Sequence, residues 1–174
     1  MAKSWHPNKN KKTPIDYTPY SSQKAWWLCA KCGYEWEAII GSRTNGGNGC
    51  FICSMSKGER RIVNFLRQQN IVFILQATAP GLVGMGGNPL RFDFVLPTEE
   101  GRWSCVIEFD GILHSGPRDL GDGAEISLRS FKVRQEHDRR KDEWCAHNGI
   151  PLLRINHTEF NHIEDILTEE VTAN

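Results

Sequence analysis

Two carboxylates lie in and beside an apolar stretch where an ionised side chain is costly to bury. Residues 105–109 are mostly apolar and β-prone, which predicts a buried strand, yet Glu108 lies within the stretch and Asp110 follows it. Period-two spacing places both side chains on the same face of that strand. A buried carboxylate needs a partner or a metal ion. His114 adds an imidazole one short loop later.

A second predicted strand brings another carboxylate to the same place. Residues 90–96 carry Asp93 in their middle, and only the turn at 97–101 separates them from the first strand, so we expect a hairpin. Asp93 and Glu108 can then face each other across neighbouring strands. Two or three converging oxygen ligands suit a hard cation such as Mg²⁺. The alternative is that Glu108 and Asp110 form structural salt bridges.

Four of the six cysteines form two C-x-x-C pairs separated by 17 residues. This spacing predicts a Cys₄ zinc site, and a module of about 55 residues has so small a core that a structural metal would help it fold. His6 is a rival ligand, but four thiolates already complete a tetrahedron. This use of cysteine favours a reducing compartment over disulfide bonds. The predicted zinc ligands are Cys29, Cys32, Cys50 and Cys53.

The net charge of zero conceals a difference between the two parts of the chain. Residues 1–57 carry eight Lys and Arg against three Asp and Glu, a net charge of +5, so the remainder carries −5. This asymmetry indicates a basic module for a polyanion and a second domain rich in carboxylates. The tryptophans of the module could stack on bases, although a small tryptophan core is the favoured interpretation. The candidate phosphate contacts are Lys9, Lys11, Lys12 and Arg43, with a solvated surface as the alternative.

The remaining pattern predicts alternating helices and strands after residue 55. Ser56 and Glu59 have the spacing of a capping box, which is the structural alternative for Glu59. Asp138 lies in a polar helix, where it could simply pair with Arg134 or Lys141. The expected elements are a helix over 56–69, a strand over 71–76, a loop over 77–89, the hairpin, a helix over about 124–148, a strand over 152–155 and a last helix capped by Thr158. We therefore expect two domains, residues 1–55 and 56–174, with a mixed α/β layer in the second.

Several short motifs in the first 55 residues occur together. They are Trp5-His6-Pro7-Asn8-Lys9-Asn10, Trp26-Trp27-x-Cys29, Gly33-Tyr34-Glu35-Trp36, Arg43 and Gly49-Cys50-x-x-Cys53. In combination they resemble a zinc-ribbon module that occurs, often repeated, in bacterial and viral proteins. That module commonly precedes a nuclease domain.

The second part of the chain contains a further ordered set of motifs. They are Arg91-Phe92-Asp93-Phe94, Val106-Ile107-Glu108-Phe109-Asp110-Gly111-x-x-His114, Asp138-x-x-Lys141 and Gly149-Ile150-x-Leu152-Leu153-Arg154. Their order and spacing over residues 56–170 resemble the PD-(D/E)xK nuclease superfamily, and within it the very-short-patch-repair (Vsr)-like endonucleases. That branch includes phage homing endonucleases with a Glu, Asp, variable, His, Asp signature. The resemblance implies a restriction-endonuclease-like mixed sheet.

The resemblance also implies a role for each matching residue. Glu59 matches the glutamate of the N-terminal helix, Asp93 the central metal-binding aspartate, Glu108 a second contributor to the metal site, His114 a base or water-positioning histidine, and Asp138 the acid that orients it. Asp110 stands where the usual E-x-K motif has lysine, so that role is unfilled locally or is taken by His114 or by Lys141. Asp110 itself stays in the candidate catalytic set, and Gln76 is a weak candidate for the edge of the site.

The expected function is hydrolysis of phosphodiester bonds in DNA. Mg²⁺ held by Asp93 and Glu108 would acidify a water, and His114 could accept the proton. The alternatives are a non-catalytic zinc-containing protein that binds nucleic acid, and an RNA-processing nuclease. No apolar run approaches the roughly 18 residues of a membrane span, and no secretory signal is evident. We expect a cytoplasmic protein, in a bacterium or in the host of a phage, whose oligomeric state the sequence leaves open.

Overall fold

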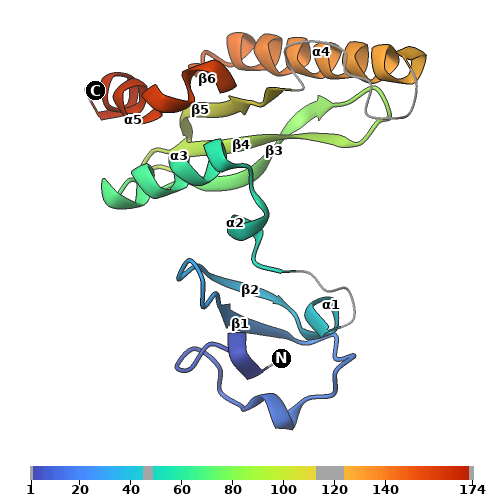
Figure 1. Ribbon diagram of the computed structural model, residues 1–174, viewed down its shortest axis with the longest axis vertical. Coiled ribbons are helices and arrows are strands. Elements are labelled where there is room, and N and C mark those ends of the chain that lie inside the picture. Colours follow the sequence, from blue (N-terminus) through green and yellow to red (C-terminus); the bar gives the residue numbers. More distant parts are fainter. Residues whose placement is uncertain (1, 45–48, 113–123, 173–174) are drawn as a thin grey trace. The chain divides into compact units, whose positions relative to one another are not determined.

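The computed structural model describes residues 2–44, 49–112 and 124–172 of the chain. It divides into two compact units, residues 1–55 and 56–174 (Figure 1). No helix in these described ranges combines the length and the apolar character needed to cross a membrane. The two units are described separately below.

The first unit is built on a two-stranded antiparallel hairpin. Strands β1 (Lys24–Leu28) and β2 (Glu35–Ile39) pair with Trp27 opposite Trp36. The buried core consists of Ala25, Trp27 and Ile40, against which Trp5, Tyr17, Trp36 and Ala38 pack. The prediction that tryptophans form the small core is confirmed for Trp5, Trp27 and Trp36. The short helices of the unit are η1 (Ala2–Ser4), η2 (Pro14–Asp16), α1 (Ile40–Thr44) and α2 (Phe51–Ser54).

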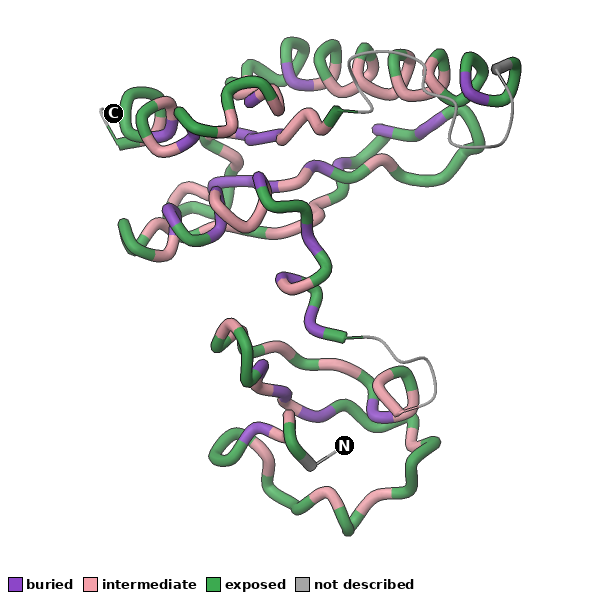
Figure 2. The backbone as a smooth tube through the Cα atoms, viewed as in Figure 1, coloured by how far each residue is buried: buried purple, intermediate pink, exposed green. Residues whose placement is uncertain are grey.

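The second unit contains a four-stranded mixed sheet in the order β3-β4-β5-β6. The first three strands are antiparallel, whereas β6 runs parallel to β5. Buried positions follow β4, β5 and the first helix of the unit (Figure 2). The elements are α3 (Lys57–Gln68), β3 (Ile74–Val83), β4 (Pro89–Pro97), β5 (Trp103–Asp110), α4 (Ala124–His147), β6 (Leu152–Asn156), η4 (His157–His162), α5 (Ile163–Leu167) and η5 (Thr168–Thr172). The mixed α/β layer, with its predicted order of helix, strand, hairpin, helix, strand and helix, is confirmed.

Three boundaries differ from the sequence prediction. Strand β3 begins at Ile74 rather than at residue 71. Residues 77–83 belong to β3 rather than to a loop; of the four glycines that indicated the loop, only Gly81 lies within the strand, at an irregularity in the register between Thr78 and Val83. The last helical segment begins earlier than predicted. Asn156, not Thr158, caps it, because the Asn156 side chain accepts a hydrogen bond from the Thr158 N–H at 3.0 Å.

Two sets of contacts hold the helices against the sheet. Trp144 and Cys145 of α4 pack with a core that includes Phe92 and Val106. At the start of α3 the Ser56 hydroxyl accepts from the Glu59 N–H at 3.2 Å, and the Glu59 carboxylate accepts from the Ser56 N–H at 2.7 Å. The predicted capping box is therefore present, and it fixes the first turn of α3.

Gly58 in that first turn provides a test of the packing. A Cβ at Gly58 would lie 2.1 Å from the ring of Phe109 on β5. We expect Gly58→Ala to lower the free energy of unfolding by about 1–3 kcal/mol because of this overlap, although Gly→Ala in an open helix gains about 0.5–1 kcal/mol. Urea unfolding followed by circular dichroism measures the change. Gly111→Ala, where an added Cβ meets nothing within 4 Å, is the control; a Gly58→Ala protein as stable as this control would contradict the packing.

Candidate functional site

The four predicted zinc ligands lie together in the first unit. Cys29 and Cys32 occupy the turn between β1 and β2, and Cys50 and Cys53 lie at the start of α2. Their sulfurs are all within 4.8 Å of one another, with 3.6 Å between Cys29 and Cys53 and 3.5 Å between Cys32 and Cys50. Four sulfurs at about 2.3 Å from a tetrahedral ion are roughly 3.8 Å apart. The thiol cluster therefore fits Zn²⁺.

The thiols differ in proton affinity before any metal binds. Burial raises the pKa of the Cys50 thiol to about 12. Burial also acts on Cys29, but hydrogen bonds from the backbone N–H groups of Cys32 and Lys31 outweigh it and bring its pKa to about 6. The Cys29 thiol therefore ionises more easily than the Cys50 thiol. Zinc would be needed to hold Cys50 as a thiolate.

His6 has a different role from that of a zinc ligand. Its Nδ1 accepts hydrogen bonds from the backbone N–H groups of Asn8 at 3.2 Å and Lys9 at 3.1 Å, and its Nε2 lies 3.1 Å from the Glu35 carboxylate. The buried imidazole therefore holds the N-terminal arm against β2. Within the described residues, the four cysteines are the one set of three or more His, Cys, Asp or Glu side chains close enough to share an ion.

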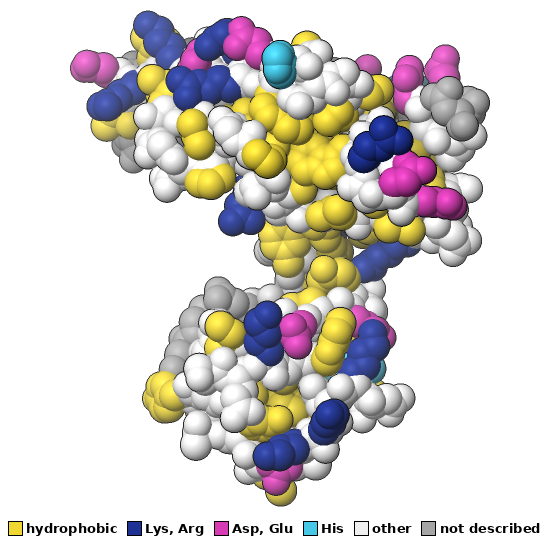
Figure 3. Space-filling view, turned by 180° about the vertical axis from the view of Figure 1, so that it is seen from behind, with side chains coloured by type: hydrophobic (Ala, Val, Ile, Leu, Met, Phe, Trp, Pro, Cys, Tyr) yellow, Lys and Arg dark blue, Asp and Glu magenta, His cyan; other side chains and the backbone are white. Residues whose placement is uncertain are grey.

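Three of the four candidate DNA contacts already engage other side chains in the first unit. Lys9 forms an ion pair with Glu35 and lies over the Trp26 ring. The Arg43 guanidinium lies over the rings of Trp27 and Trp36, 4.9 and 5.1 Å from their centres, and the Lys12 Nζ lies 6.0 Å from the centre of the Tyr17 ring. Lys11 is exposed. Lys and Arg side chains are spread over the face of this unit in the lower part of Figure 3 rather than gathered in one patch. DNA contact by these residues stays a prediction.

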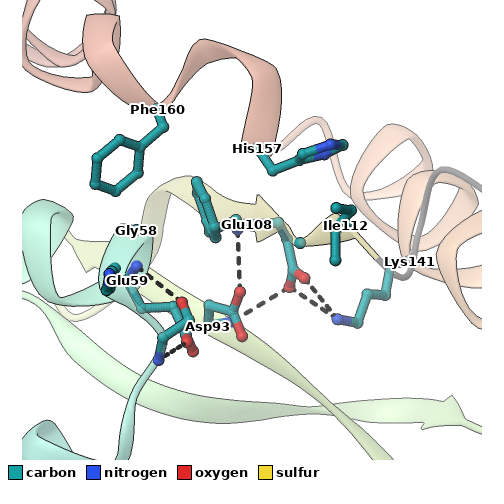
Figure 4. Close-up of a pocket in the computed structure, with 12 residues that line it drawn as sticks. Gly58, Glu59, Asp93, Glu108, Ile112, Lys141, His157 and Phe160 are labelled. Carbon is teal, nitrogen blue, oxygen red and sulfur yellow. Dashed lines mark hydrogen bonds and ion pairs between the residues drawn. The ribbon is translucent and has the colours of Figure 1, made fainter. Parts of the chain in front are cut away.

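In the second unit Asp93 and Glu108 meet where β4 and β5 begin to separate. The last paired residues there are Phe94 and Ile107. Beyond them, Glu108 Oε1 accepts from the Asp93 N–H at 3.2 Å, and Asp93 Oδ2 accepts from the Phe109 N–H at 3.0 Å. Each carboxylate therefore accepts a hydrogen bond from a backbone N–H that is no longer paired between the two strands (Figure 4). The predicted hairpin indeed brings the two side chains together.

Lys141 reaches the same point from α4. Its Nζ lies 2.9 and 2.8 Å from the two carboxylate oxygens of Glu108; the Glu108 side chain is buried, and 12% of the Lys141 side chain is exposed. The same Nζ is 5.5 Å from the centre of the Phe92 ring. An ammonium group thus stands beside the carboxylates, in the place for which sequence analysis proposed either Lys141 or His114. His114 lies outside the described residues.

The site is short of positive charge despite Lys141. Burial and the neighbouring Asp93 carboxylate raise the pKa of Glu108 to about 7, against the lowering effect of Lys141. Burial and the charge of Glu59 likewise raise the pKa of Asp93, although the Phe109 N–H lowers it. A divalent cation would relieve both effects. Two carboxylates suit Mg²⁺, which usually retains waters and takes only one or two protein carboxylates.

Two more side chains complete the surroundings of Asp93. Glu59 caps α3 and also lines the pocket that contains Asp93 and Glu108, so its capping interaction does not remove it from the candidate site. Gln76 donates from Nε2 to Asp93 Oδ1 at 3.2 Å, and its backbone has φ of +51°, an unusual value for a non-glycine residue within a strand. Gln76 was a weak candidate for the edge of the site, and its left-handed backbone has no signature in the sequence.

Asp110 and Asp138 lie around a different cation. Arg154 of β6 is 3.1 Å from Asp110, 3.8 Å from Asp138 and 2.8 Å from Asp142. The Asp138 partner identified here is thus Arg154, whereas the sequence suggested Arg134 or Lys141. Arg154 was named in the sequence only as the end of the motif Gly149–Arg154, and no role was assigned to it there. These ion pairs join β6 to β5 and to α4.

The pocket over Asp93 has a volume of about 640 Å³. Its lining combines acidic, basic and apolar side chains from α3, β4, β5, α4 and η4. Glu59 and Asp93 lie on one side of it, and His157 and Phe160 on the other (Figure 4). The described lining residues are Ser56, Lys57, Gly58, Glu59, Asp93, Glu108, Phe109, Gly111, Ile112, Lys141, His157 and Phe160.

Comparison with known families bears on the first unit. Residues 1–56 match a family model described as "Probable Treble clef zinc finger domain". The first unit is therefore similar to a treble clef zinc finger, whereas its sequence motifs indicated a zinc ribbon. No curated protein matches the chain.

Replacing one cysteine tests the zinc site. Cys29→Ser should lower the bound zinc from about one ion per chain to a small fraction, because structural zinc sites of this kind need all four ligands. The first unit should unfold with it, since zinc binding supplies about 10 kcal/mol or more to such modules. Elemental analysis gives the zinc content, and Cys105→Ser in β5 is the control. Unchanged zinc in the Cys29→Ser protein would refute the ligand assignment.

The raised pKa of Glu108 predicts a pH dependence of stability without Mg²⁺. Between pH 4.5 and about 7 the folded protein retains a proton that the unfolded chain has lost, so the free energy of unfolding should fall as pH rises through this window. The loss is at most about 3 kcal/mol. Urea unfolding of the zinc-saturated protein at several pH values measures it. Glu108→Gln should flatten the slope, whereas Glu100→Gln on the surface should not; equal slopes in both variants would exclude Glu108 as the cause.

Proposed function

We propose that this protein is a metal-dependent DNA endonuclease, with Zn²⁺ as a structural ion and Mg²⁺ as the catalytic ion. The observation that carries the proposal is the pair of carboxylates formed by half-buried Asp93 and buried Glu108, whose pKa values are raised where two strands separate. Such a pair in a pocket is costly to maintain and gains a purpose when a cation binds. The motif resemblance to Vsr-like nucleases supports the same interpretation.

In this proposal each side chain of the pocket has a definite task. Asp93 and Glu108 would hold Mg²⁺, which supplies polarisation of the phosphate and a more acidic water. Lys141 would balance the charge of Glu108 and present its ammonium group to the phosphate. Gln76 orients Asp93 through its 3.2 Å hydrogen bond, and Glu59 adds negative charge at the same wall. His114 is retained as the proposed proton acceptor on the basis of the resemblance alone.

DNA rather than a small molecule is the proposed substrate because of the first unit. Its treble-clef-like zinc module, with a surplus of lysine and arginine, belongs to a class of domain that commonly contacts nucleic acid. The module would add phosphate contacts outside the pocket. A nuclease acting on RNA would use the same chemistry, so the substrate test below includes both polymers.

A second candidate function is supported by one specific contact. The ion pair between Lys141 and Glu108 neutralises a carboxylate without any metal, as a non-catalytic nucleic-acid-binding scaffold would require. Titration with Mg²⁺, followed by the backbone amide signals of Asp93 and Phe109, separates the two functions. Binding at these amides favours the nuclease, and its absence favours the scaffold.

The replacement of Asp93 tests the nuclease directly. Asp93→Asn should reduce Mg²⁺-dependent cleavage of supercoiled plasmid by about 1,000-fold or more, because the metal loses a charged ligand. Folding should persist, since asparagine can still accept from the Phe109 N–H. Binding to DNA through the first unit should also persist, and Glu100→Gln is the control.

The products and the polymer carry further information. Nicked circles indicate cleavage of one strand, and linear molecules indicate cleavage of both. Cleavage of RNA but not of DNA would support the RNA-processing alternative. Cleavage at the wild-type rate by Asp93→Asn would reject the active-site assignment.

A further inference from the structure

An imidazole lines the acidic pocket from a segment that no motif singled out. His157 lines the pocket together with Glu108 and Lys141 (Figure 4). Its position follows from the parallel pairing of β5 with β6, in which Asp110 lies opposite Asn156. Gly111 and His157 are the next residues of each chain segment, so both leave the sheet at the same edge and both line the pocket.

The backbone around His157 is held in place by local hydrogen bonds. The Asn156 side chain accepts from the Thr158 N–H at 3.0 Å, and the Glu159 carboxylate accepts from the Asn156 N–H at 2.9 Å. This capping box encloses His157 and defines the direction in which the chain leaves β6. The side chain of His157 is half-buried. Its imidazole is therefore presented by an ordered turn.

The wall that carries His157 is also fixed relative to α3. Arg61 of α3 donates to the Phe160 carbonyl at 2.6 Å and to the Glu164 carboxylate at 2.6 Å, and its guanidinium lies 4.9 Å from the centre of the Phe160 ring. His157 and Phe160 thus form a stable wall facing the side that carries Glu59 and Asp93 (Figure 4). A pre-organised wall can hold a substrate without first paying for its own ordering.

The chemistry of the pocket needs a donor at this wall. Its acidic groups repel a phosphodiester, Lys141 is shared with Glu108, and the other lysine of the lining, Lys57, belongs to the start of α3 and not to the wall that carries His157. Phe160 and Ile112 give the wall an apolar surface suited to a sugar or a base, but they provide no side-chain donor for phosphate oxygens. An imidazole N–H supplies that donor.

We propose that His157 is a substrate-contacting residue that donates a hydrogen bond to a non-bridging oxygen of the bound phosphodiester strand, across the pocket from Asp93. This inference rests on the proposed function and assigns the substrate wall of the same site. His157 acts on binding of the strand rather than on the metal. In agreement with this, His157 does not belong to any set of three or more metal-ligating side chains among the described residues.

Steady-state cleavage by full-length, zinc-loaded protein with Mg²⁺ and a short DNA duplex tests this role. His157→Phe, which keeps a ring but has no donor, should raise KM by about 10- to 100-fold, as expected for loss of a charge-assisted hydrogen bond, with kcat within about 3-fold of the wild type. The Mg²⁺ concentration for half-maximal activity should stay the same. The matched control is His162→Phe, because His162 ends the same η4 segment with its side chain 70% exposed. An unchanged KM, or a shifted Mg²⁺ requirement, would overturn the proposal.

A second measurement does not depend on the variant folding or on cleavage. The ¹H–¹³C spectrum of the His157 ring in the wild-type protein, recorded with Ca²⁺ in place of Mg²⁺, should shift when the duplex is added, whereas the His162 ring should not. A His157 signal that stays in place while DNA binds would overturn the proposal. Wild-type protein that cleaves neither DNA nor RNA would instead overturn the proposed function, and the ring titration would then decide on His157 alone.

Discussion

The charge balance at Asp93 and Glu108 is the constraint on which the second unit depends. Two carboxylates lie side by side in a buried place, and burial together with their repulsion raises both pKa values. The structure offsets this cost with Lys141 and with backbone N–H groups that the separating strands leave unpaired. The separation of β4 from β5 and the position of α4 therefore both depend on the contacts of the Asp93 and Glu108 carboxylates.

A second ionic group supports the first without entering the pocket. Arg154 of β6 holds carboxylates of β5 and α4, so it ties the parallel strand pair to the long helix. The polar face of α4 thus has two cationic contacts at different depths, Lys141 with Glu108 and Arg154 with Asp142. This arrangement explains why a helix with so polar a middle packs over the sheet, although Trp144 and Cys145 supply the apolar contact.

The first unit meets a different constraint. Its core contains few buried residues. The Arg43 guanidinium packs over the rings of Trp27 and Trp36, and the His6 side chain accepts a hydrogen bond from the Asn8 N–H of the N-terminal arm. Such a core is small for independent stability, which gives the four-sulfur cluster its physical purpose. Lys9 and Arg43 contact other side chains of the same unit. The net positive charge of the unit is therefore larger than the charge available for contact with a nucleic acid.

Local patterns by themselves determined much of this protein. The spacing of the two C-x-x-C pairs, the Ser56 and Glu59 capping box, the hairpin that joins Asp93 to Glu108, and the long polar helix all depend on neighbours along the chain, and they are present. Only the tertiary structure decided which distant side chains meet. Lys141 with Glu108, Arg154 with Asp110 and Asp138, Gln76 in its left-handed conformation, and His157 at the pocket depend on strand pairing and helix placement. A one-dimensional pattern carries no record of such pairings, because the same residues are equally compatible with surface positions until β6 takes its place beside β5.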